Sequence, residues 1–201
     1  MLENLKPFYN AVLNPVARLC TRINLHPHAI TIFGVALSIA AGYFCATGGW
    51  YAAALLVFAG SCLDGLDGLV ARQTGKTTAF GAVLDSCCDR ITETAWFFGI
   101  LYFYLHRPAY GNAGIFLAFL AMAGSLMVSY VRARCEGAGI ACRAGMLQRP
   151  ERIVVLIACL LAGPVIMIWG LGFLSLLAYA TMVQRLIIAH RAEKNTIKTD
   201  R

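Results

Sequence analysis

Five acidic residues lie within or beside apolar segments of this 201-residue chain: Asp64, Asp67, Asp85, Asp89 and Glu93. Asp64 and Asp67 are three positions apart, and Asp85 and Asp89 are four apart, so each pair shares one face of a helix. An ionisable side chain in a membrane segment is costly, and its presence there indicates a function. The connection between the two pairs is short, so we expect antiparallel neighbouring helices and four carboxylates that converge.

Four clustered carboxylates repel one another unless a cation lies between them. Hard oxygen ligands favour Mg²⁺, Mn²⁺ or Ca²⁺, and such a set suits a two-metal site for phosphoryl chemistry. Gly65 and Gly68 lie among the aspartates, where a helical glycine costs about 1 kcal/mol relative to alanine. That cost is understandable if a bulky group approaches the backbone. Arg72 follows one turn later and could meet a phosphate; alternatively, Arg72 and Arg90 form helix-end salt bridges with the aspartates.

The elements that position these residues are long apolar segments. Of all residues 59% are hydrophobic and 13% are charged, whereas soluble domains have about a quarter charged residues. A span needs about 20 apolar residues. Six segments are therefore predicted to cross a membrane in an all-α integral membrane fold: Thr31–Thr47, Tyr51–Val70, Val83–Leu105, Ala113–Val131, Ile153–Trp169 and Leu171–Ile188.

The charge distribution predicts the topology. The net charge is +7, with 17 Lys and Arg residues, and with six spans every one except Arg107 falls on the same side. The positive-inside rule then places both termini and the carboxylates at the cytoplasmic face of the cell membrane. Residues 1–24 are predicted to form an amphipathic interfacial helix, residues 25–191 the transmembrane domain, and residues 192–201 a cytoplasmic tail.

Other classes of protein fit the sequence less well. The eight cysteines contain no CxxC pair and are interpreted as packing residues rather than as a disulfide framework or zinc site. No basic stripe with interleaved aromatic residues suggests nucleic-acid binding. The positive charge is expected to attract anionic membrane lipids.

The aspartate region resembles the signature of the CDP-alcohol phosphotransferase family. The sequence reads DGLDGLVAR from Asp64 to Arg72, then, after eight residues, GAVLDSCCD from Gly81 to Asp89. All eight defined positions of the family pattern D-x2-D-G-x2-A-R-x8-G-x3-D-x3-D match. The resemblance implies six transmembrane helices, a homodimer, and a site with two Mg²⁺ or Mn²⁺ ions.

The same resemblance implies roles for individual residues. Asp64, Asp67, Asp85 and Asp89 would hold metal, and Asp89 would also be the catalytic base that accepts the acceptor hydroxyl's proton. The oxygen then attacks the lipid-side phosphorus, and CMP leaves. His28 departs from the pattern, because relatives usually carry Asn or Asp there. The positions that would contact the CDP-lipid are His28, Ala29, Ile30, Thr31, Gly68, Arg72 and Thr78.

Arginines suggest the nature of the acceptor alcohol. Five of them lie at the cytoplasmic ends of the last three predicted spans, and arginine binds phosphate in a bidentate manner. The motifs around them resemble bacterial phosphatidylinositol phosphate synthases, which implies transfer from CDP-diacylglycerol to inositol 1-phosphate. The candidate acceptor-phosphate contacts are Arg132, Arg149, Arg152 and Arg185, with Arg134 as a further candidate; alternatively, these arginines serve only topology.

Other functions remain open at this point. Phosphatidylglycerophosphate synthase also uses a phosphorylated acceptor, glycerol 3-phosphate, but Ser86 and Arg90 differ from the Asp-Pro and Lys expected there. An archaeal-type inositol phosphate transferase differs mainly in its lipid. Outside the family, an intramembrane aspartyl protease needs only two buried aspartates, and a transporter would show inverted repeats or broken helices.

Overall fold

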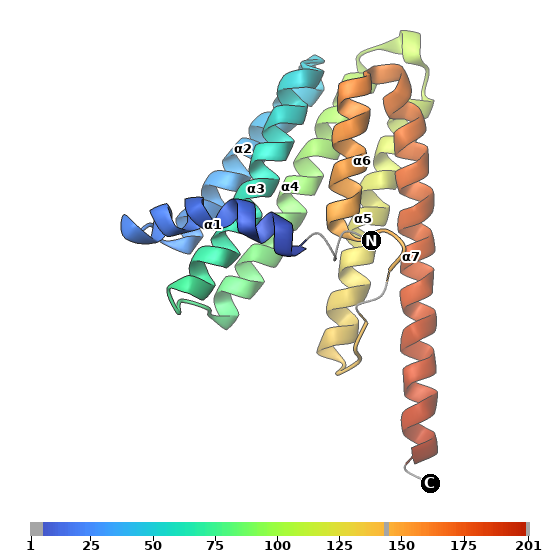
Figure 1. The fold of residues 1–201 in the computed structure, drawn as a ribbon. Helices are drawn as coiled ribbons and strands as arrows, with labels where there is room; N and C mark the ends of the chain where they lie inside the picture. Colours follow the sequence, from blue (N-terminus) through green and yellow to red (C-terminus); the bar gives the residue numbers. More distant parts are fainter. Residues whose placement is uncertain (1–5, 143–144, 200–201) are drawn as a thin grey trace.

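The computed structural model describes residues 6–142 and 145–199, and its regular elements there are all helical (Figure 1), which confirms the predicted all-α class. In chain order they are α1 (Lys6–Arg22), α2 (Pro27–Thr47), α3 (Trp50–Gln73), α4 (Ala79–Leu105), the 3-10 helix η2 (Pro108–Tyr110), α5 (Ala113–Gly137), α6 (Arg149–Ala162) and α7 (Pro164–Thr199).

Within the described residues, four helices are long and apolar enough to cross a membrane, not the six predicted: α2, α3, α5 and Pro164–Ala192 of α7. The helix α4 has 27 residues but carries Asp85, Asp89 and Arg90 in its first half and Glu93 just past its midpoint. The helix α6 has only 14 residues and begins part-way along the bundle in Figure 1. The charged residues of α4 and the short length of α6 therefore distinguish these two helices from the four candidate membrane spans.

The predicted boundary between the last two spans at Trp169-Gly170 is wrong. The helix α6 ends at Ala162, Gly163 adopts a positive φ of 91°, and Pro164 starts α7. Glycine tolerates this left-handed backbone, and proline is favoured in the first turn of a helix. The helix α7 then continues to Thr199, past the predicted start of the tail at residue 192; residues 200–201 lie outside the described residues.

The helices α2 and α4 approach each other backbone to backbone. A Cβ atom added to Gly99 would lie 2.1 Å from the Gly42 carbonyl oxygen, and one added to Gly42 would lie 2.5 Å from the Ala95 carbonyl oxygen. Small residues permit such close approach between membrane helices. Beside this crossing, Trp96 and Ile100 are buried in the main core.

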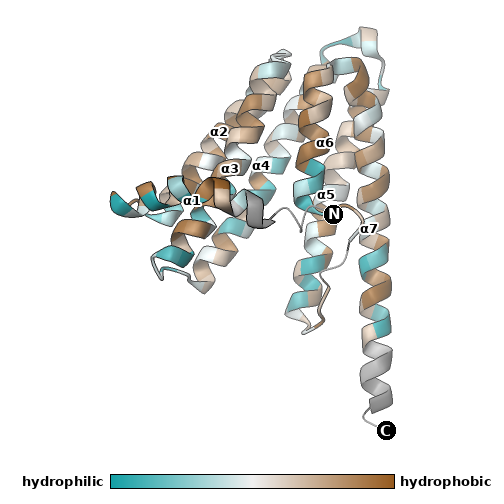
Figure 2. Ribbon diagram, in the orientation of Figure 1, coloured by the Kyte–Doolittle hydropathy of each residue, from teal (hydrophilic) through white to brown (hydrophobic). Residues whose placement is uncertain are grey.

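Hydrophobic residues predominate along the helices of the bundle (Figure 2), and many large ones are exposed on its outside. Exposed examples include Phe33, Leu55, Phe116 and Leu176, each on a different helix. Exposure on this scale is typical of helices that face lipid rather than water. Most cysteines pack inside, as expected; the buried ones are Cys20, Cys45, Cys88, Cys135, Cys142 and Cys159.

The helix α1 lies across α3 (Figure 1). Leu13 and Ala17 on one face of α1 pack in a cluster with Leu66 and Val70 of α3, while Val12 and Leu19 are exposed. The predicted helix within residues 1–24 is thus confirmed over Lys6–Arg22, and residues 1–5 lie outside the described part.

Candidate active site

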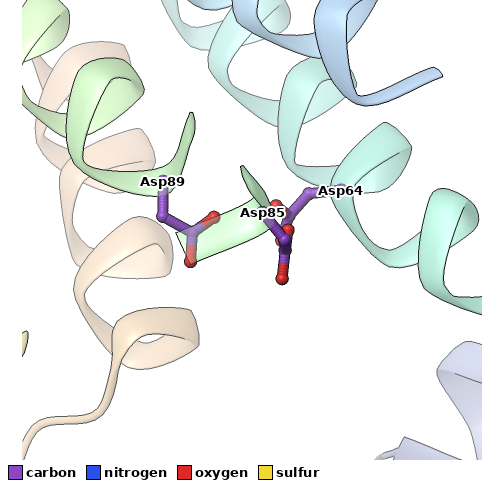
Figure 3. Close-up of side chains that lie close together, drawn as sticks. All are labelled: Asp64, Asp85 and Asp89. Atoms are coloured by element: carbon purple, nitrogen blue, oxygen red, sulfur yellow. The ribbon is translucent and has the colours of Figure 1, made fainter. Parts of the chain in front are cut away.

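Three of the predicted carboxylates meet between α3 and α4. Asp64 comes from α3, Asp85 and Asp89 come from α4, and one oxygen of each lies within 4.8 Å of the others (Figure 3). Both helices pack closely against α2, and they run antiparallel as neighbours, as expected (Figure 1). The space between them is where the carboxylates converge.

Asp67 is turned away from the other three. Only 6% of it is exposed, and its carboxylate accepts a hydrogen bond of 2.5 Å from the Thr31 hydroxyl of α2. Three residues advance a helix by about 300°, so Asp67 is rotated from Asp64 toward α2. Both aspartates still line one small cavity of about 20 Å³. The predicted convergence of four carboxylates therefore holds for three, with Asp67 behind them.

The donor set fits a divalent cation. Carboxylate oxygens are the ligands that Mg²⁺ and Mn²⁺ favour, and three separate side chains offer them within 4.8 Å. Asp89 Oδ1 is buried, and the Arg149 guanidinium lies 2.9 Å from it, so a cationic group already approaches this oxygen. Asp64, Asp85 and Asp89 could therefore hold such an ion, with Asp67 beside them.

Arg149 adjoins this cluster from the first turn of α6. Its Nη1 atom lies 2.7 Å from Asp64 Oδ2 and 2.9 Å from Asp89 Oδ1. The local fold explains this position: the Glu151 carboxylate accepts a hydrogen bond from the Gln148 backbone N–H, and Pro150 occupies the first turn. Both features favour a helix start at this point.

The other candidate acceptor arginines differ in environment. Arg152 is buried, and its Nη2 atom lies 2.9 Å from Glu93 Oε1. Arg185 is also buried and donates a hydrogen bond to the Val128 carbonyl oxygen at 2.6 Å. Arg132 is exposed and pairs with Glu136 one turn along α5. Arg132 and Arg152 each lie within electrostatic reach of Arg185. Among these candidate acceptor arginines, Arg149 is the one that contacts the clustered aspartates within the described part of the chain. Arg90 of α4, which is not a candidate acceptor contact, also lies 3.7 Å from Asp89 Oδ2, as the helix-end salt-bridge alternative expected.

The candidate CDP-lipid contacts lie at helix ends near the cluster. His28, Ala29, Ile30 and Thr31 form the first turn of α2; the Ile30 side chain is buried in the α1–α3 cluster, which leaves only its backbone for a ligand. The His28 ring meets Phe80 edge to face at 5.9 Å. Helix N-termini such as this one favour anions.

The remaining CDP-lipid candidates lie beside that turn. The Thr78 hydroxyl caps α4 by accepting a hydrogen bond from the Gly81 N–H at 2.9 Å. The Arg72 guanidinium lies beside Gly68, 3.3 Å from where a Cβ atom would be. Gly68 therefore leaves room for Arg72 to lie close against α3.

Two residues near the site had no assigned role in the predicted set: Tyr9, and Glu93, which the sequence singled out only as an acid in an apolar segment. Tyr9 of α1 donates a hydrogen bond to the Ser61 carbonyl oxygen at 3.2 Å, and its hydroxyl is 2.4 Å from where a Gly65 Cβ atom would lie. Burial above all, with smaller contributions from Cys62 and Asp64, raises the pKa of Tyr9 to about 12. The bulky group that Gly65 admits is therefore Tyr9, which no local spacing indicates.

Glu93 is the second such residue. Its position four residues after Asp89 places it on the same face of α4, and that spacing could have identified it. It accepts hydrogen bonds from Ser125 and Arg152 and joins the arginines to the aspartate cluster.

Comparison with known proteins agrees with this geometry. The profile of the CDP-alcohol phosphatidyltransferase family matches residues 24–189. The archaetidylinositol phosphate synthase of Methanothermobacter thermautotrophicus is 39% identical over 193 residues, 93% of each chain. The phosphatidylinositol phosphate synthase of Corynebacterium glutamicum is 32% identical over 186 residues, 90% of this chain and 85% of the relative.

Solved structures are similar as well. The phosphatidylinositol phosphate synthase of Mycobacterium tuberculosis with CDP-DAG bound has a TM-score of 0.80 and 30% identity, over 89% of this chain and 94% of that one. The same enzyme in complex with manganese and citrate has a TM-score of 0.78 over 88% of both chains. By its sequence, its fold and its carboxylate cluster, the chain belongs to the CDP-alcohol phosphatidyltransferase family.

Proposed function

We propose that this protein transfers the phosphatidyl group of CDP-diacylglycerol to inositol 1-phosphate, which gives phosphatidylinositol phosphate and CMP. The observation that carries this proposal is the contact of Arg149 with two clustered aspartates. An arginine suited to bind the acceptor phosphate thereby lies directly beside carboxylates suited to bind metal. Relatives that are named for inositol phosphate chemistry and cover most of the chain support the acceptor.

In the proposed mechanism, Asp64, Asp67, Asp85 and Asp89 hold two Mg²⁺ or Mn²⁺ ions. Bound metal supplies positive charge that stabilises the phosphates. Asp89 accepts the proton of the inositol phosphate hydroxyl, and the resulting oxygen attacks the lipid-side phosphorus while the bond to CMP breaks. Arg72 neutralises charge that develops on the phosphates.

The two substrates are proposed to bind on either side of these carboxylates. Arg149, Arg152 and Arg185 bind the acceptor phosphate, and Arg132, which is exposed, adds a weaker contact. The CDP moiety contacts a separate set of residues: His28, Ala29, Ile30, Thr31, Gly68, Arg72 and Thr78.

We further propose that α4 and α6 complete six spans, with α1 on the membrane surface and both termini and the site facing the cytoplasm. In this arrangement residues 1–24, 25–191 and 192–201 form the interfacial helix, the transmembrane domain and the tail. The positive charges of the loops support this orientation. A homodimer in the cell membrane is the proposed assembly.

The lipid of the donor has a second candidate. The 39% identical relative is named for an archaetidyl product, which favours an archaeal-type ether lipid as the alternative. Glycerol 3-phosphate remains the alternative acceptor.

One assay tests donor and acceptor together. Purified enzyme receives CDP-diacylglycerol or its archaeal ether analogue, with inositol 1-phosphate, glycerol 3-phosphate, free inositol or serine, and CMP release is measured. We expect release with inositol 1-phosphate and little with free inositol, which cannot engage the arginines. Preference for glycerol 3-phosphate would assign the alternative function, and preference for an unphosphorylated alcohol would refute the acceptor site.

A further inference from the structure

Glu93 lies at the junction between the carboxylates and the arginines. It is on α4, one turn beyond Asp89, and is only 5% exposed. One carboxylate oxygen accepts a hydrogen bond from the Ser125 hydroxyl of α5. The other lies 2.9 Å from Arg152 Nη2 and 3.5 Å from Arg149 Nε. A single carboxylate thus contacts two arginines on successive turns of α6.

Arg149 is consequently held at two edges of its guanidinium. Its Nη1 atom faces Asp64 and Asp89, and its Nε atom faces Glu93. A planar guanidinium binds phosphate best when its plane and direction are fixed. Contacts with the aspartates alone would leave the group free to turn about one edge. Glu93 adds an electrostatic contact at a second edge, 3.5 Å from a buried Nε atom that makes no hydrogen bond within the described residues.

Stability alone is a poor explanation for this arrangement. Burying charges costs several kcal/mol per ion, and apolar residues of similar size are often as stabilising as a buried ion pair. The carboxylate lies where the metal-binding and phosphate-binding groups meet, and both of its oxygens have partners. A role in orienting those groups accounts for its place.

We propose that Glu93 is a positioning residue that holds Arg149 and Arg152 as a pair, at a fixed orientation to the aspartate cluster, for the acceptor phosphate. The proposal rests on the proposed function, because it assigns the arginines to the acceptor. The contacts of Glu93 within the described residues are with Ser125, Arg149 and Arg152. It acts on the acceptor through the direction of two guanidinium groups.

The test is Glu93→Gln, which keeps the shape of the side chain and removes its charge. We expect the KM for inositol 1-phosphate to rise about tenfold or more, the loss expected for one charge-assisted hydrogen bond. The KM for CDP-diacylglycerol should change less than about threefold by the same reasoning. Ser125→Ala is the matched control: it removes one partner of Glu93 but leaves both arginine contacts, and it should leave the acceptor KM close to wild type.

A double-mutant cycle with Arg149→Lys separates positioning from an independent role. If Glu93 acts through Arg149 and Arg152, Glu93→Gln raises the acceptor KM less in the Arg149→Lys background than in the wild type, because coupled residues are not additive; the remaining effect is the part that acts through Arg152. Additive effects, or equal losses in kcat and both KM values, would overturn the proposal. Glu93→Asp keeps the charge on a shorter stem and should give an intermediate acceptor KM. Failure of both Glu93 variants to fold would assign the residue to stability and reject positioning.

The wild-type acceptor panel keeps the two proposals distinguishable. It tests the function before any variant is made. The cycle is then run with whichever phosphorylated acceptor the wild-type protein uses. If the wild-type protein does not use inositol 1-phosphate as acceptor, the proposed function is rejected but the role of Glu93 is not. If the KM effects of the two substitutions are additive, the positioning role of Glu93 is rejected but the function is not.

Discussion

The α2–α4 half and the α5–α7 half contribute opposite charges to the site by different routes. The clustered carboxylates come from 26 consecutive residues, between Asp64 and Asp89. The candidate acceptor arginines come from three helices and extend from Arg132 to Arg185. Helical periodicity alone brings the carboxylates of each pair together, whereas only tertiary packing can bring the arginines together. The pairing of the carboxylates in the α2–α4 half can therefore be predicted from local spacing, whereas the grouping of the arginines in the α5–α7 half cannot.

The two halves also differ in how their charges are paired. In the α2–α4 half, three carboxylates are gathered at one point, which is unfavourable without compensating positive charge, and Arg149 from the other half contacts only Asp64 and Asp89 of these three. In the α5–α7 half, each arginine has its own contact: Arg152 with Glu93, Arg185 with a backbone carbonyl and Arg132 with Glu136. We therefore expect the first half to depend on an added ion and the second to tolerate single substitutions better.

We expect the largest effect from removal of metal, which disrupts the carboxylate cluster of the α2–α4 half and leaves the arginines of the α5–α7 half in place. Excess EDTA should abolish CMP release, and added Mg²⁺ or Mn²⁺ should restore it, because the clustered carboxylates need a cation. Asp64→Ala and Asp85→Ala should be inactive yet folded, as judged by thermal unfolding and size-exclusion chromatography. Robust turnover in excess EDTA would contradict the metal assignment.

Asp89→Asn should have the next largest effect. The amide cannot accept the acceptor's proton, so kcat should fall about 10²- to 10⁴-fold, the range for general-base catalysis. CDP-lipid binding, measured separately with radiolabelled ligand, should weaken less. A parallel collapse of binding and rate would make Asp89 chiefly a metal ligand.

Arg149→Lys tests the arginine that joins the α5–α7 half to the carboxylates of the α2–α4 half. Lysine keeps the charge but loses the planar fork, so the KM for inositol 1-phosphate should rise roughly 10-fold to 100-fold. Metal-dependent binding of CDP-lipid should persist. An unchanged acceptor KM would show that Arg149 serves the aspartates alone.

Arg132→Lys is the matched comparison and should have the smallest effect. Arg132 is exposed and paired with Glu136, and exposed ion pairs contribute about 0–1 kcal/mol. Its acceptor KM should therefore change less than about fivefold. An effect as large as that of Arg149→Lys would mean that Arg132 reaches the phosphate on substrate binding.

The limits of sequence reasoning follow from the same contrast. Periodicity placed Asp64, Asp85 and Asp89 correctly, but it could not show that Asp67 turns toward Thr31, because that depends on where α2 packs. The helix break at Gly163-Pro164 was visible in the sequence as a glycine–proline pair, but the apolar run continues through it. Tyr9 lies 52 residues before the backbone group that it binds, and no local pattern reports such a contact.

The close crossing of α2 and α4 links a packing contact to the position of the carboxylates further along α4. Gly99 is ten positions from Asp89 along α4, or about 15 Å at the rise of an α-helix. A methyl group at Gly99 would act as a wedge against the Gly42 backbone and tilt the far arm that carries Asp85 and Asp89. A displacement of about 1 Å at a reacting group can cost about 100-fold in rate. The close packing of Gly42 and Gly99 therefore helps to fix the positions of the Asp85 and Asp89 carboxylates, although neither glycine touches them.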